Sequence, residues 1–158
     1  MSQDGNAYQG LRPERKLQLF LFEAERFITS IVGYSKLVSA DAQRPLLRKL
    51  LSADFVQSLE AIEQTGGKFA RSLRDITMPE ETNSYRDALI KQTLLMVLNL
   101  SYSPISVITG YSALLDTEAQ KLDLALELPP QFVDNLQMMH TAAERLSNTR
   151  EELSESMK

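Results

Sequence analysis

Side chains that could act as nucleophiles or as general acids and bases are few in this sequence. It contains one histidine, His140, and no cysteine. A neutral imidazole nitrogen can act as a nucleophile, so His140 is the one candidate of this kind. Acidic pairs occur at Glu80-Glu81 and Glu151-Glu152, which we interpret as solvated charges at helix ends or in a linker rather than as an acid–base pair. The residue types alone therefore give little support to a catalytic site.

Composition narrows the class of protein further. The chain has 158 residues, a net charge of −4 and a pI near 5.1, which argues against a nucleic-acid footprint. With one histidine and no cysteine, we expect no metal site of the usual zinc or iron kind and no cofactor. The longest apolar run, Leu94–Leu98, is too short to span a membrane, and the first residues lack the apolar core of a signal peptide. We expect a cytoplasmic protein.

The two halves of the sequence match each other at an offset of 77 residues, and such periodicity is the signature of a repeat. Any two helices in the same heptad phase would share leucines, but they would not share whole strings at one offset. The matching strings are Gly33-Tyr34-Ser35 with Gly110-Tyr111-Ser112, and Phe55-Val56 with Phe132-Val133. We therefore expect one domain, 1–158, built from repeats 1–78 and 79–158.

Apolar residues recur in alternating steps of four and three, the spacing of helices that pack in a bundle. The first such seam consists of Leu17, Leu21, Ala24, Ile28, Ile31, Ser35 and Val38. The pattern predicts an all-α fold with helices over 13–40, 52–76, 85–116 and 131–155. Four helices of this kind pack as an antiparallel bundle. Here it would consist of two homologous hairpins, which makes a single-chain pseudo-dimer.

The connections carry their own signals. Within each half we expect a loop of about ten residues, and the first, which contains Pro45, can hold a short helical turn. Asn83 or Ser84 can cap the third helix. Arg150 is the one break in the apolar seam of the last helix, and there we expect the seam to open to water.

One segment resembles a known family. Leu98–Leu115, LNLSYSPISVITGYSALL, is similar to the phosphoacceptor helix of sensor histidine kinases, with Pro104, Ile105, Ser106, Ile108, Gly110 and Tyr111 at the family's motif positions. Residues 142–146, Ala-Ala-Glu-Arg-Leu, look like the family's second helix. The resemblance covers about 28–76 and 85–155. It implies a two-helix hairpin of the dimerisation domain, duplicated in one chain, in bacterial two-component signalling.

The same resemblance indicates that the phosphoacceptor chemistry is lost. The family's histidine should lie five residues before the proline, at Asn99, and the matching position of the first half is Phe22. Neither an amide nor a phenyl ring can accept a phosphoryl group in this way. The acidic neighbour is Leu100 in the second half and Glu23 in the first. The sequence also lacks a glycine-rich stretch that could bind ATP.

His140 remains as an alternative phosphoacceptor. Its matched position in the first half is Glu63, and no acid adjoins it in the sequence. We therefore interpret it mainly as a polar residue at the edge of the seam. Met138 and Met139 are interpreted as core filling.

Several side chains point off the predicted seam and are candidates for contacting a partner. Phe22 is one, as a large aromatic residue beside the core positions. Leu95, Asn99 and Tyr102 form an outward stripe at i, i+4 and i+7. The resemblance implies that a response regulator docks on this flank. The backbone-special residues, Gly33, Tyr34, Pro104, Gly110 and Tyr111, are expected to shape helix bending and packing.

Three interpretations of the function follow as expectations, of which the last is an unrelated structural role for the bundle, because fold alone does not determine function. The first is a non-catalytic signalling protein that binds a response-regulator receiver domain or a histidine kinase as adaptor or competitor. The second is a histidine phosphotransferase that uses His140. Because both hairpins lie in one chain, we expect a monomer.

Overall fold

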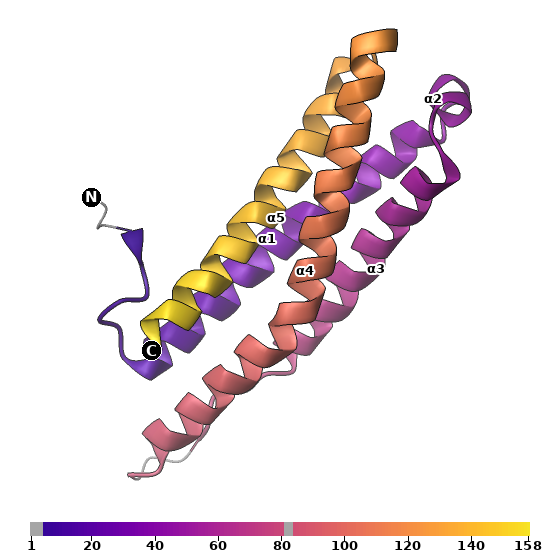
Figure 1. The fold of residues 1–158 in the computed structure, drawn as a ribbon. Helices are drawn as coiled ribbons and strands as arrows, with labels where there is room; N and C mark the ends of the chain where they lie inside the picture. The colour runs from indigo at the N-terminus through magenta and orange to yellow at the C-terminus, as the bar shows by residue number, and fades with distance from the viewer. Residues whose placement is uncertain (1–4, 81–83) are drawn as a thin grey trace.

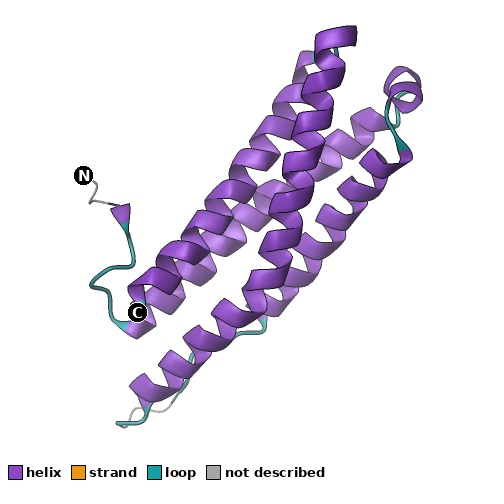
Figure 2. Ribbon diagram, in the orientation of Figure 1, coloured by secondary structure: helices purple, strands orange, loops and turns teal. Residues whose placement is uncertain are grey.

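The computed structural model describes residues 5–80 and 84–158, and its regular structure is entirely helical (Figure 1). Its helices are α1 (Pro13–Ala42), α2 (Pro45–Leu50), α3 (Ala53–Arg74), α4 (Arg86–Leu126) and α5 (Pro130–Ser156). Within the described ranges no strand occurs (Figure 2). The predicted all-α class is therefore confirmed.

The four long helices lie alongside one another as an elongated rod (Figure 1). α1 packs against α3 and α5, and α4 packs against the same two helices. α1 and α4 also approach each other, whereas the backbones of α3 and α5 stay apart over their described lengths and meet through the rings of Phe55 and Phe132. The outer edge formed by α1 and α3 therefore lies opposite the outer edge formed by α4 and α5.

The residues at the helix starts explain where three of the four long helices begin. Proline occupies the first turn of α1 and of α5, where its missing N–H costs nothing. α3 begins after Ser52, whose side chain accepts a hydrogen bond from the Phe55 amide at 3.1 Å, as an N-cap does. The predicted cap of α4 is wrong for Ser84, because the N-cap residue is Tyr85 without a side-chain capping bond. Asn83 lies outside the described residues, as does Glu81.

The predicted third helix, 85–116, ends too early. α4 continues to Leu126 instead of stopping near residue 116, because no proline interrupts it where Pro45 interrupts the first half. It stops at Glu127, which has a left-handed backbone with φ 50°, and Asp123 accepts a hydrogen bond from the Leu128 amide at 2.8 Å. The second loop is therefore only 127–129. The short helical turn expected at Pro45 is present as α2.

The predicted seams form the core. The seam residues of α1 are buried except Leu21, which packs against the core at its edge. Residues 77 positions apart are buried together at most seam positions: Leu17 with Leu94, Ile28 with Ile105, Ile31 with Ile108, Ser35 with Ser112, Phe55 with Phe132 and Leu59 with Leu136. The rings of Phe55 and Phe132 stack with their centroids 6.0 Å apart.

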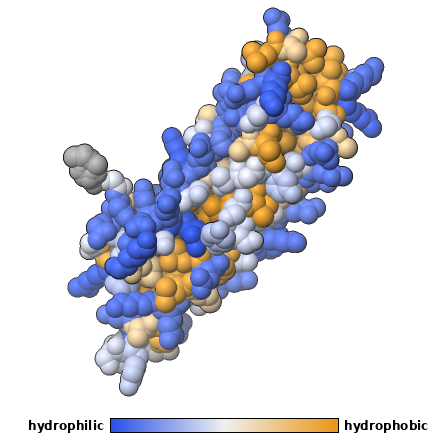
Figure 3. All heavy atoms as spheres, viewed as in Figure 1, coloured by the Kyte–Doolittle hydropathy of each residue, from blue (hydrophilic) through white to orange (hydrophobic). Residues whose placement is uncertain are grey.

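α4 is also the helix most apolar in composition. Its length and an 18-residue window of mean hydropathy 1.3 would be enough to cross a membrane, a test that core helices of water-soluble proteins also pass. About a third of that window is buried against the rest of the chain, and hydrophobic residues gather on the surface at the upper end of the rod, where the last turns of α4 lie (Figure 3).

Candidate interaction site

The stripe predicted on the third helix lies on the surface of α4. Leu95 is 54% exposed, Tyr102 is 62% exposed, and Asn99 between them is exposed as well. These residues share one face because they are four and then three positions apart on a helix. The expected outward direction of all three is therefore confirmed.

Arg150 of the neighbouring helix α5 contacts this part of α4. Its guanidinium donates to the Leu98 carbonyl, at 2.7 Å from Nη2 and 3.1 Å from Nε. Nε also lies 3.2 Å from Ser101 Oγ. The same group sits over the Tyr102 ring, 5.1 Å from its centroid, in the geometry of a cation–π contact. Arg150 is half-buried, so the expectation that the seam opens to water here is wrong: the charge is satisfied by the α4 backbone instead.

The matched part of the first half carries different groups. Phe22 is 66% exposed, as expected, and it borders a shallow groove of about 500 Å³ with Leu11, Arg15, Gln18 and Leu19. Glu23 forms an ion pair with Arg26, and the Arg26 guanidinium lies 4.7 Å from the centroid of the Phe27 ring. Phe22 and Asn99 thus each face solvent from their own helix.

The glycines of the motif do not serve helix packing. Gly33 and Gly110 are both exposed, and a Cβ built on either would have no atom within 4 Å. Their expected packing role is therefore wrong. Tyr34 packs at the edge of the core, Tyr111 is 37% exposed, and Pro104 is half-buried inside the continuous helix α4.

A close approach between helices occurs at a different glycine, Gly66 of α3. A Cβ at this position would come within 2.8 Å of Val32 Cγ2 of α1. Gly66 is therefore the glycine that helix packing requires.

His140 has two polar neighbours, one four residues further along its own helix and one on another helix. Its Nδ1 lies 3.3 Å from Ser112 Oγ of α4, and its Nε2 lies 3.5 Å from Glu144 Oε1, one turn along α5. The interpretation that His140 lacks an acidic neighbour is therefore wrong. The Ser112 hydroxyl donates to the Thr109 carbonyl at 3.1 Å and can accept from Nδ1–H, while the Glu144 carboxylate can accept from Nε2–H. Which ring nitrogen of neutral His140 keeps its lone pair depends on the tautomer.

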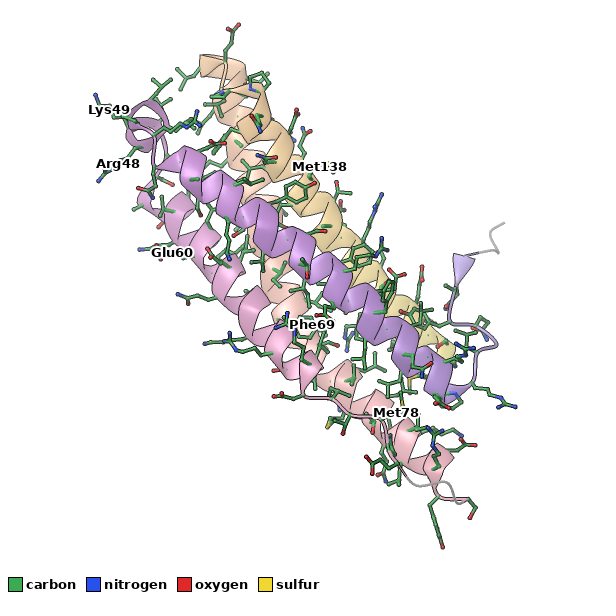
Figure 4. All side chains as sticks on the ribbon, turned by 180° about the vertical axis from the view of Figure 1, so that it is seen from behind. Arg48, Lys49, Glu60, Phe69, Met78 and Met138 are labelled. Atoms are coloured by element: carbon green, nitrogen blue, oxygen red, sulfur yellow. The ribbon has the colours of Figure 1, made fainter. Side chains whose placement is uncertain are left out.

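The methionines divide between core and surface. Met139 is fully buried, which confirms core filling for this residue. Met138 is 50% exposed and points outward (Figure 4), so the same interpretation is wrong for it.

The side chains of the stripe are suited to noncovalent binding of a partner. Asn99 offers an amide, Tyr102 an amphipathic ring and Leu95 an apolar side chain, a combination common in binding surfaces. Across the described parts of the chain, no group of three histidine or acidic side chains is arranged to hold a metal ion. The sequence locates Arg150 as a charged side chain at an otherwise apolar seam position, but it does not predict the contacts of Arg150 with α4.

Comparison of the chain with protein-family models, with curated proteins and with solved structures gives no match.

Proposed function

We propose that the protein is a non-catalytic interaction protein related to the dimerisation domains of sensor histidine kinases. It binds a response-regulator receiver domain or a kinase, as an adaptor or competitor, and acts as a monomer in the cytoplasm. The observation that carries this proposal is the exposed stripe of Leu95, Asn99 and Tyr102, placed where the family's phosphoacceptor would lie and occupied by residues without a nucleophile.

The architecture we propose is an antiparallel four-helix bundle built from two homologous hairpins, α1–α3 and α4–α5. Two observations support it. The first helix of each half packs against the second helix of both halves. Buried residues also recur 77 positions apart along both helices of each half. A fused pair of this kind needs no second chain to complete its core.

Titration against purified receiver domains and kinase cores of the host tests the proposal. We expect saturable binding at micromolar concentration to at least one of them. Tyr102→Ala should weaken this binding about tenfold, the effect of losing roughly 1.4 kcal/mol at an interface. Leu124→Ala is the matched control, since Leu124 is 91% exposed at the far end of α4. Absence of binding to every receiver and kinase sinks the proposal.

A phosphotransferase is the second candidate, favoured by the Ser112–His140–Glu144 arrangement. A phosphoryl group would pass from the aspartyl phosphate of a receiver to the ring nitrogen of His140 that keeps its lone pair, releasing the aspartate carboxylate. Incubation with a phosphorylated receiver should then give acid-labile label on the wild type and none on His140→Ala. An unlabelled wild type removes this candidate.

A further inference from the structure

A groove runs along the outer edge between α1 and α3, on the side of the molecule seen in Figure 4. It has a volume of about 450 Å³. Val32 contributes a half-buried apolar side chain to its lining, and Ile28 and Ala70 lie beneath it as buried core residues. Gly33 and Gly67 leave stretches of backbone without side chains. The floor therefore exposes a small apolar area and is low enough for another element to approach closely.

The rim of this groove is cationic. Lys36, Arg71 and Arg74 line it. Arg74 pairs with Glu25 at 3.2 Å, and both side chains are more than half exposed, so solvent screens this pair. Within the described ranges, the side chains of Lys36 and Arg71 have no hydrogen-bond or ion-pair partner. Two uncompensated cations thus flank an apolar floor in a chain whose net charge is −4.

The matched edge between α4 and α5 lacks this character. Ala113 stands at the position of Lys36, Asn148 at that of Arg71, and Glu151 at that of Arg74. Glu144 stands at the position of Gly67. The cations at these positions are therefore a property of the first half alone, and the matched positions of the opposite edge are neutral or acidic.

We propose that the α1–α3 groove is a docking surface for an amphipathic helix of a partner protein that carries acidic residues beside its apolar face. The apolar face packs on Val32 and on the open backbone at Gly33 and Gly67, and the carboxylates meet Lys36 and Arg71. A trough between two helices suits a third helix, because side chains on helices pack as ridges into grooves. Glu25 at the Arg74 end and the acidic opposite edge disfavour an extended polyanion such as nucleic acid. This inference rests on the proposed role as an interaction protein, but not on the identity of the receiver or kinase.

The test uses a fluorescently labelled helical peptide of roughly 18 residues, about five turns, with leucine on one face and glutamate on both flanks. We expect saturable binding by fluorescence anisotropy at low salt that weakens as salt is raised. A control peptide with lysine at every glutamate position should bind at least about tenfold more weakly. Lys36→Glu with Arg71→Glu should reverse this preference.

A second pair of variants checks the location. Gly33→Leu places a side chain in the groove, and Gly110→Leu places one at the matched position of the other edge. Both sites are open, so both variants should fold, as checked by thermal melting. We expect Gly33→Leu to weaken peptide binding about tenfold and Gly110→Leu to leave it unchanged.

Three results overturn the inference: no saturable binding, equal binding of both peptides, or equal effects of the two glycine variants. Self-association of the wild type in sedimentation that disappears in Lys36→Glu also overturns it, by assigning the groove to a second copy. Since the assay contains no receiver or kinase, peptide binding with a negative receiver screen refutes the proposed function alone.

Discussion

The connections that follow α1 and α4 start and end alike but differ in between. Ala42 and Ala119 are both buried at the start, and Leu51 and Leu128 are both buried at the end. Between them the first chain segment turns into α2 and buries Leu47, which is 2% exposed, whereas the matched Leu124 is 91% exposed on a continuous helix. The difference follows from Pro45, which cannot continue a helix from the preceding turn, in place of Leu122. One residue thus decides whether the same leucine joins the core.

The largest effect should come from this leucine pair. Leu47→Ala removes a buried side chain and should lower the free energy of unfolding by about 2–4 kcal/mol. Leu124→Ala should change it by less than about 0.5 kcal/mol. Urea denaturation of both variants measures the difference. Equal losses would show that the two connections are energetically alike.

Arg150 gives the next contrast between the halves, because the matched residue, Leu73, is buried and apolar. Arg150→Met keeps an unbranched side chain but loses the bonds to Leu98 and Ser101, so we expect a loss of about 1–3 kcal/mol. Arg150→Lys should recover only part of this, since an ammonium cannot reproduce the forked geometry of the guanidinium. If the methionine variant is as stable as the wild type, the contacts to α4 contribute nothing.

Tyr8 is buried, whereas the matched Tyr85 is 70% exposed. We expect the burial of Tyr8 to make the stability of the protein depend on pH. Burial raises the pKa of the Tyr8 phenol above its usual value of 10.0, and the Glu23 carboxylate raises it further. The folded state therefore favours the protonated phenol. Its stabilising contribution is complete below pH 10.0 and is lost as pH rises beyond it, by at most about 1.4 kcal/mol per pH unit. Tyr8→Phe should reduce the fall in stability between about pH 9 and pH 11.

The smallest effects on stability should come from two exposed glycines, one in each half, and these two effects should be equal. Gly33→Ala and Gly110→Ala each remove backbone freedom at an open helical site, and each should raise stability by about 0.5–1 kcal/mol. Gly66→Ala should do the opposite, because its Cβ would meet Val32 at 2.8 Å and force repacking. Thermal melts of the three variants compare them directly. A stability loss in either exposed variant would restore a packing role for that glycine.

Local signals in the sequence predict much of this fold. The starts of α1, α3 and α5 were predictable because Pro13, Ser52 and Pro130 mark them chemically. The end of α4 was not, because the prediction transferred a loop from the first half to a segment without its proline. The contact of His140 with Ser112 and those of Arg150 with α4 depend on how α4 is aligned along α5, which helical periodicity alone does not determine. Exposure of the stripe on α4 was predictable, because it follows from the spacing along a single helix.

Charge is distributed unevenly between the two pairs of helices, and this has a physical consequence at a distance. Acidic and basic residues balance in α1 and α3, whereas acidic residues are in excess in α4 and α5, which gives the rod an electric dipole across its width. A charged surface or protein would exert a torque on this dipole within roughly one Debye length, about 8 Å at physiological ionic strength. The rod would then rotate to present one long side before any contact forms, which raises the rate of productive encounters.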